Sequence, residues 1–365
     1  YGIQGRLDVL LETPGGVRKI IELKSGKPFR ADSNGINTNH KGQAFLYDLL
    51  IQSVYKENRN NQCYILYSSQ TNNSLRQSIP DVKSKKDLLM LRNSIVLLHY
   101  HLAFSNPSDN SFLDRVKMKM ISSLDSFVRR DAENWIKAFG ELDELEKKYF
   151  KHYTYFIARE QLIAKTGYSG VTQTAGLASL WLFSREEKEL QFSILADLVI
   201  KEVLLTDNDA PVISLENKFG KNLMTSFRSG DTLVFYPEFI DRQGILSHQV
   251  YKCTLVGLSH SECIIRLRGR QFDATSLPPN TAWNLEPDSL DRSYLHQYEN
   301  LYEFARAPKI YRDKILGRIP PITKTHQNFE FTNLNSNISE LVKKILSAQD
   351  YFLLWGPPGS GKTSI

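Results

Sequence analysis

Two groups of chemistry-bearing residues, one near each end of the chain, constrain the fold more than any other feature. Residues 5–8 read Gly-Arg-Leu-Asp and residues 22–24 read Glu-Leu-Lys, on either side of a Pro-Gly-Gly turn. Residues 356–363 read Gly-Pro-Pro-Gly-Ser-Gly-Lys-Thr. The first group needs neighbouring strands and the second needs a tight loop before a helix, so we expect at least two domains. A chain of 365 residues is long enough to bury a core in each.

The composition is that of an ordinary globular protein with a basic surface. Hydrophobic residues make up 41% and charged residues 24%, and no apolar stretch approaches the roughly 18–20 residues of a membrane span. We therefore expect no membrane partner. Cys63, Cys253 and Cys263 lack metal-ligand or disulfide spacing. They are expected to be reduced, buried thiols of an intracellular protein in the cytoplasm or nucleoid, or in the nucleus of a eukaryote. The net charge of +6 favours an anionic partner.

The first 82 residues predict a small α/β core. Three stretches have strand patterns: residues 3–11, 17–24 and 63–68. Residues 39–55 have a helical pattern that places Gln43 and Tyr47 on one stripe. The strand-strand-helix-strand order predicts a sheet with this helix lying across it.

Four further segments follow the core. Residues 83–206 are mostly helical, and Ser184-Arg-Glu-Glu187 before an apolar run is a helix start. Within residues 207–280, residues 230–272 alternate polar and apolar side chains at short spacing, which predicts a small antiparallel β-barrel. Residues 281–330 predict a stalk helix and a linker. In residues 331–365, a helix over 338–348 precedes Tyr351–Trp355, which we expect to be a buried strand.

The residues around the first turn are suited to holding a divalent cation. Glu22 and Lys24 lie two residues apart on a strand, so their side chains share one face. Asp8, on the neighbouring strand of the hairpin, can reach the same side. Carboxylates hold hard cations, which activate water, and a nearby lysine orients that water or neutralises charge on a phosphate. A Glu-x-Lys pair alone also occurs by chance on exposed strands, so the prediction depends on the conjunction.

That conjunction resembles the RecB-like branch of the PD-(D/E)xK nuclease superfamily. The residues that carry the resemblance are Gly5, Asp8, Glu22, Lys24, Gln43 and Tyr47. It implies that Asp8, Glu22 and the carbonyl of Leu23 bind magnesium or manganese, and that Lys24 assists the attacking water. It also implies that Gln43 and Tyr47 position the lysine and the nucleic acid. An inactivated nuclease fold is the alternative.

Two features of the family have no counterpart in the sequence. The upstream acidic or histidine ligand would precede Tyr1, so we expect the chain to be a piece of a longer protein. His40 lies on the same helical stripe as Gln43 and Tyr47, but the resemblance assigns it no certain role. We expect it to be a surface or structural histidine. Many relatives also bind an iron–sulfur cluster through a Cys-x2-Cys group, whereas the only cysteine between Tyr47 and Asp207 is Cys63. We predict no cluster.

The second group of residues matches the Walker A pattern. Its backbone N–H groups are expected to wrap the phosphates of ATP, with Lys362 reaching the β and γ oxygens and Thr363 binding magnesium. The expected nucleotide-binding residues are Gly356, Pro357, Pro358, Gly359, Ser360, Gly361, Lys362, Thr363 and Ser364. The surrounding sequence resembles superfamily 1 helicases. Ile338 stands where that family usually has a glutamine for adenine recognition.

The order of segments resembles the Dna2 family of replication and repair helicase–nucleases. It predicts an α/β protein with a PD-(D/E)xK nuclease core (1–82), a helical insertion (83–206), a small β-barrel (207–280), a stalk helix and linker (281–330) and the start of a P-loop RecA-like domain (331–365). The resemblance implies a metal-dependent single-stranded DNA nuclease fused to an ATP-dependent helicase. The expected partners are single-stranded or flapped DNA and a single-strand-binding protein, and the expected state is a monomer.

Two alternatives remain open at this point. A nuclease-dead scaffold would use the same core to bind DNA beside an ATP switch. An RNA helicase of the Upf1 type would share the P-loop and the barrel, but the residue cluster at 2–47 argues against it.

Overall fold

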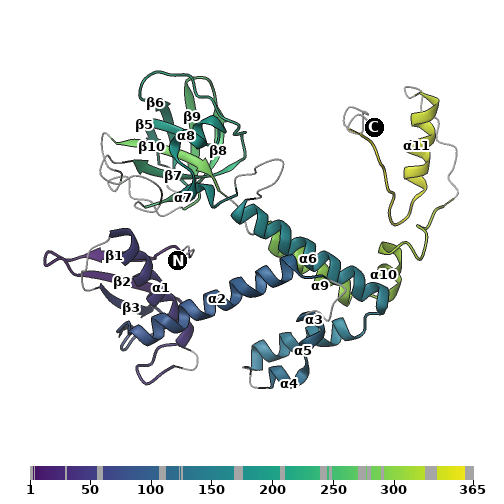
Figure 1. Ribbon diagram of the computed structural model, residues 1–365, viewed down its shortest axis with the longest axis horizontal. Helices are drawn as coiled ribbons and strands as arrows, with labels where there is room; N and C mark the ends of the chain where they lie inside the picture. The colour runs from purple at the N-terminus through teal and green to yellow at the C-terminus, as the bar shows by residue number, and fades with distance from the viewer. Residues whose placement is uncertain are drawn as a thin grey trace. The chain divides into compact units, whose positions relative to one another are not determined.

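The computed structural model of the protein is mixed α/β and contains a closed six-stranded barrel (Figure 1). The described residues are 3, 5–28, 31–55, 61–106, 112–122, 124, 126–167, 176–205, 210–238, 245, 249–269, 277, 281–288, 292–324 and 335–357. They divide into two compact units. One comprises Tyr1–Ser105 with Phe156–Tyr294, and the other comprises Asn106–Tyr155 with Leu295–Ile365.

The N-terminal part of the first unit is a four-stranded sheet covered by a helix. In sheet order, the strands are β1 (Val9–Glu12), β2 (Arg18–Lys24), β3 (Asn61–Tyr67) and β4 (Leu75–Ser78). The β1–β2 and β3–β4 pairs are antiparallel, and β2–β3 is parallel. The helix α1 (Thr38–Tyr55) makes the crossover between the parallel strands. The predicted strand-strand-helix-strand order is confirmed. The first strand begins at Val9 rather than at residue 3, and β4 was not predicted.

The two sides of β2 have different environments, which determines where its functional groups lie. Arg18, Ile20 and Glu22 are buried, whereas Leu23 is 44% exposed on the opposite face. Alternation along a strand therefore puts the side chains of Glu22 and Lys24 on the same side, toward α1. The core on that side consists of Ile20, Ile36, Ala44, Phe45, Tyr47, Ile51, Cys63, Ile65 and Tyr67.

A long helix, α2 (Val82–Phe104), follows the sheet, and its N-terminus is capped by Asp81. Lys85 of α2 forms an ion pair with the buried carboxylate of Asp48 in α1. The remaining helices before the barrel are α3 (Phe112–Arg115), α4 (Met118–Ile121), α5 (Ser126–Gly140), α6 (Glu144–Thr166), α7 (Ser179–Leu182) and α8 (Arg185–Leu190). The helix start predicted at Ser184 is confirmed, because its side chain and that of Glu187 form a reciprocal capping box. None of the described helices has the length and apolarity needed to cross a bilayer.

The barrel is larger than the sequence pattern predicted. Around the barrel the strands are β10 (Ala282–Pro287), β5 (Leu195–Leu204), β6 (Val212–Asn217), β9 (Glu262–Leu267), β8 (Tyr251–Leu258) and β7 (Thr232–Glu238). Every neighbouring pair is antiparallel. The predicted barrel boundaries, 207 and 280, exclude β5 and β10. β5 escaped prediction because its register shifts between Ile200 and Glu202, which interrupts the alternation of its side chains.

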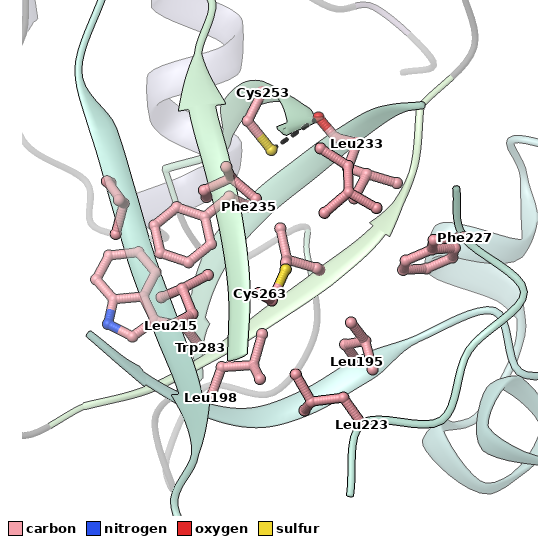
Figure 2. Packing of buried hydrophobic residues seen from close by; sticks show 14 of the residues in the cluster. Leu195, Leu198, Leu215, Leu223, Phe227, Leu233, Phe235, Cys253, Cys263 and Trp283 are labelled. Atoms are coloured by element: carbon pink, nitrogen blue, oxygen red, sulfur yellow. Dashed lines mark hydrogen bonds between the residues drawn. The ribbon is translucent and has the colours of Figure 1, made fainter. Parts of the chain in front are cut away.

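The barrel interior is filled by aliphatic, aromatic and thiol side chains (Figure 2). Trp283 is 1% exposed and stacks on Phe235 with ring centroids 4.2 Å apart. Cys253 donates its S–H to the carbonyl of Leu233 at 3.4 Å. Burial raises the pKa of the Cys263 thiol to about 12 and that of Cys63, in the other core, to about 12. All three thiols are free and buried, as predicted.

The second unit contains the helices that follow the barrel among the described residues. After α9 (Arg292–Arg306) come α10 (Lys309–Ile315) and α11 (Ser336–Ser347). Tyr149 of α6 contacts Phe304 of α9, with ring centroids 4.7 Å apart. The prediction of a buried strand at Tyr351–Trp355 is wrong. These residues have no regular structure, and Trp355 is 90% exposed. A strand is stable only beside strands that satisfy its backbone groups, and the described part of this unit provides none there.

Candidate active site

The β1–β2 hairpin brings Asp8 to the end of β2. Val9 pairs with Ile21, so the next position in this register places Asp8 opposite Glu22. An oxygen of the Asp8 carboxylate, Oδ2, accepts a hydrogen bond of 2.8 Å from the backbone N–H of Leu23. In an extended strand the N–H and C=O of one residue point to the same side. The carbonyl of Leu23 therefore faces the edge at which Asp8 lies.

Glu22 is a buried acid at the centre of this group. It is 3% exposed, and its Oε1 accepts a hydrogen bond of 2.7 Å from the ammonium of Lys24. Burial raises the pKa of Glu22, Lys24 opposes that change, and the nearby Asp8 carboxylate adds to it. The hairpin register places the two acids opposite each other, so their negative charges repel. The other oxygen, Oε2, is buried without a hydrogen-bond partner among the described groups.

A short hydrogen-bonded chain connects Lys24 to α1. The Lys24 ammonium donates a second hydrogen bond, of 3.0 Å, to Oε1 of Gln43. The amide nitrogen of Gln43 donates to the Tyr47 hydroxyl at 2.9 Å. Gln43 and Tyr47 share a helix face because they are four residues apart. Burial raises the pKa of Tyr47, so its hydroxyl remains protonated at neutral pH. These hydrogen bonds hold the lysine against Glu22.

The glycine of the Gly-x-x-Asp segment allows the backbone before β1 to approach α1 closely. A Cβ atom at Gly5 would lie 2.7 Å from Cε1 of Tyr47 and 3.4 Å from a methyl group of Leu50. Only glycine fits here without displacing the tyrosine ring. The structure thus gives a steric reason for the glycine that the sequence pattern contained.

Two residues that the sequence did not assign to the site lie beside it. The hydroxyl of the buried Tyr67 is 3.0 Å from Nδ1 of His40 and accepts the backbone N–H of Asn37 at 3.1 Å. Tyr67 pairs in register with Lys24 on the adjacent strand. Burial lowers the pKa of His40, and the Lys24 charge lowers it further. Burial alternates along β3 at Cys63, Ile65 and Tyr67, whereas the sequence of residues 63–67 is apolar throughout and gave no signal for the direction of Tyr67 or for its hydroxyl.

The residues of this group fit a hard divalent cation. No cluster of three or more His, Cys, Asp or Glu side chains suited to a metal is present in the described part of the chain. Magnesium, however, typically uses only one or two carboxylates and keeps several waters. The fit is supported by the unpartnered Glu22 oxygen, by the adjacent Asp8 carboxylate and by the Leu23 carbonyl at the same edge. A cation would also relieve the repulsion between the two acids.

The predicted nucleotide site lies almost entirely outside the described residues. Gly356 and Pro357 are described and have no regular secondary structure. The positions outside the described residues are Pro358, Gly359, Ser360, Gly361, Lys362, Thr363 and Ser364. The Walker A interpretation therefore remains a prediction from the sequence.

Comparison with known proteins supports the resemblance inferred from the sequence. No family model matches the chain. A protein of Gallus gallus named DNA replication ATP-dependent helicase/nuclease DNA2 is 21% identical over 407 residues, which cover 100% of the chain and 39% of the relative. A protein of Schizosaccharomyces pombe with the same name is 22% identical over 422 residues, which cover 100% of the chain and 28% of the relative. The chain thus resembles Dna2-type proteins along its whole length and spans 28–39% of theirs.

Proposed function

We propose that this chain, similar throughout its length to Dna2-type helicase/nucleases, carries a metal-dependent nuclease for single-stranded DNA and the start of an ATP-dependent helicase. The observation that carries the nuclease proposal is the meeting of Asp8, Glu22 and Lys24 at the end of one hairpin, where Lys24 is hydrogen-bonded to Glu22 and to Gln43 of α1. The whole protein would process flaps or ends in DNA replication or repair.

In this proposal Asp8, Glu22 and the Leu23 carbonyl hold magnesium or manganese. A bound divalent ion supplies an activated water and neutralises charge on the scissile phosphate. Glu22 contributes a ligand oxygen that no protein donor occupies among the described groups. Asp8 is oriented by the Leu23 N–H, which leaves its second oxygen for the metal.

Lys24 is assigned to stabilise the negative charge that develops on the phosphate and to orient the attacking water. Its ammonium is held by Glu22 on one side and Gln43 on the other. Tyr47 fixes the amide of Gln43 so that its oxygen faces the lysine. A cationic side chain held in place in this way requires little rearrangement when the substrate arrives.

The second activity belongs to residues 356–364, which we propose bind the phosphates of ATP, with magnesium on Thr363. The proposed partners are single-stranded or flapped DNA and a single-strand-binding protein, with the chain acting as a monomer. The proposed location is the cytoplasm or nucleoid, or the nucleus in a eukaryote. Lys362→Ala in the whole protein is expected to abolish ATP-driven strand separation and to leave cleavage of single strands intact.

Cleavage of labelled single-stranded DNA with magnesium or manganese tests the nuclease. Asp8→Ala and Lys24→Ala are expected to lower the cleavage rate by about 100-fold or more. Lys27→Ala is a matched control, because it removes an exposed charge near the same hairpin. If the wild-type chain binds DNA and no divalent ion supports cutting, the silent scaffold is the better description.

A further inference from the structure

The hydrogen bonds around the buried hydroxyl of Tyr67 determine which nitrogen of His40 carries the proton. Tyr67 is 0% exposed, and its hydroxyl accepts the N–H of Asn37. A phenol has one proton to donate and needs an acceptor for it when buried. Among the described groups, Nδ1 of His40, 3.0 Å away, is the acceptor that this hydroxyl can reach. The Tyr67 hydroxyl therefore donates to Nδ1, and the neutral imidazole carries its proton on Nε2.

The resulting Nε2–H group lies next to the proposed active site. His40 is half-buried and precedes Gln43 by three residues on α1, so the two side chains are neighbours on one helix face. The charge of Lys24 acts on the His40 ring. Tyr67, which fixes the ring, pairs in register with Lys24. His40 thus presents a neutral N–H donor of defined orientation beside the lysine.

We propose that His40 donates this Nε2–H to a phosphate oxygen of the DNA strand that is cut, and that Tyr67 is the positioning residue that sets its tautomer. The proposal rests on the proposed nuclease function. The group of the substrate that accepts this hydrogen bond is a phosphodiester oxygen. Because the phosphate is charged, its hydrogen bond with an N–H is stronger than one with a neutral acceptor.

The same geometry distinguishes this role from metal binding. A histidine ligand must offer an unprotonated nitrogen to the metal. In His40, Nδ1 accepts from Tyr67 and Nε2 carries the proton; freeing Nε2 for a metal would reverse this hydrogen bond and take away the acceptor of the buried phenol proton. A neutral donor also adds no positive charge beside Lys24 and the metal. The arrangement therefore favours a phosphate contact over a third metal ligand.

Three substitutions and one control in the 365-residue chain test the proposal. His40→Leu removes the donor, His40→Gln retains an N–H at a similar reach, and Tyr67→Phe removes only the hydroxyl. Tyr64→Phe is the matched control, because it removes a hydroxyl from the same strand on the opposite face, where Tyr64 donates to Gln62. The readouts are kcat and KM for single-stranded DNA, DNA affinity by fluorescence anisotropy in EDTA, thermal midpoints and the His40 tautomer by two-bond ¹H–¹⁵N NMR.

The phosphate is charged in both the bound substrate and the transition state, so losing the contact should raise KM more than it lowers kcat. We expect His40→Leu to raise KM and weaken DNA binding by about 10- to 100-fold. His40→Gln should recover most of this loss. Tyr67→Phe should give a mixed tautomer and an intermediate KM, while Tyr64→Phe should match the wild type.

Three results would overturn the proposal. The first is a wild-type His40 protonated on Nδ1, and the second is a His40→Leu variant with wild-type KM and DNA affinity. The third is an equal loss in His40→Leu and His40→Gln, which would assign His40 a structural role instead. If the wild-type chain cuts no DNA, the proposed function fails by itself. The tautomer and the metal-free DNA affinity still decide the role of His40.

Discussion

Substitution of Gly5 by alanine should displace Tyr47 and thereby disturb the position of Lys24, although Gly5 itself carries no functional group. The added Cβ would lie 2.7 Å from Cε1 of Tyr47, whereas ordinary contacts begin at 3.4 Å, so the ring must move by about 0.7 Å. Such a movement would lengthen the 2.9 Å hydrogen bond between Gln43 and the Tyr47 hydroxyl to about 3.6 Å, where it no longer exists. Gln43 would lose its fixed orientation, and Lys24 would lose one of its two supports.

The free energy cost follows from the packing around Tyr47. The ring is 7% exposed within the α1 core, so it has little room to retreat. Overpacking at such a site costs about 1–3 kcal/mol of stability. Misplacement of Lys24 should lower the cleavage rate by about 10- to 100-fold, because small displacements of catalytic groups have large kinetic effects.

Urea denaturation and cleavage of labelled single-stranded DNA measure both effects. Gly15→Ala is the control, because a Cβ there meets no atom within 4 Å. It should leave activity unchanged and stabilise the fold by about 0.4–1 kcal/mol, since alanine reduces the entropy of the unfolded chain. In a Tyr47→Leu background, Gly5→Ala should no longer destabilise. The reasoning is refuted if Gly5→Ala is as stable and as active as Gly15→Ala.

Three further predictions concern stability and are checked by urea denaturation. Trp283→Ala should cost about 3–5 kcal/mol, because Trp283 is 1% exposed, whereas Trp355→Ala, at a side chain that is 90% exposed, should leave the unfolding free energy unchanged. Burial raises the pKa of Glu286 above 4.5, so the proton on Glu286 stabilises the folded state. This contribution to the free energy of unfolding is complete below pH 4.5 and is lost as the pH rises through the raised pKa. The wild type should therefore lose stability relative to Glu286→Gln from pH 4.5 toward neutrality. Glu146→Leu should cost about 3–5 kcal/mol, because the buried Arg312 loses its partner at 2.9 Å.

Local patterns predicted much of the fold where turn chemistry and side-chain periodicity agree. The Pro-Gly-Gly turn produces the β1–β2 hairpin, with Gly16 at φ 75°. The Ser184–Glu187 capping box begins α8 as expected. β5 was missed because Asp197 has φ 54° and the register shifts further along the strand, so its side chains do not alternate regularly. Residues 351–355 were assigned to a strand from apolar content alone, which cannot supply a pairing partner.

The candidate site shows the same division between local and long-range information. Glu22 and Lys24 share a face because of strand periodicity, and Gln43 and Tyr47 share one because of helical periodicity, so these neighbours were predictable. The hydrogen bonds that link Tyr47 to Gln43 and Gln43 to Lys24 depend on how α1 lies on β2, and no local pattern specifies this. The same is true of Tyr67 and His40, 27 residues apart, whose contact forms only after the sheet is assembled.

Binding of manganese to the metal-free chain, without nucleotide, tests the central claim most directly. Electron paramagnetic resonance of free Mn²⁺ would compare the wild type, Asp8→Asn and Glu12→Gln, the last of which changes an exposed acid on the same hairpin. We expect the wild type and Glu12→Gln to bind manganese with equal affinity. Asp8→Asn should bind about 10-fold or more weakly, because one of two carboxylate ligands is lost. Equal binding by wild type and Asp8→Asn would show that Asp8 and Glu22 do not form the metal site.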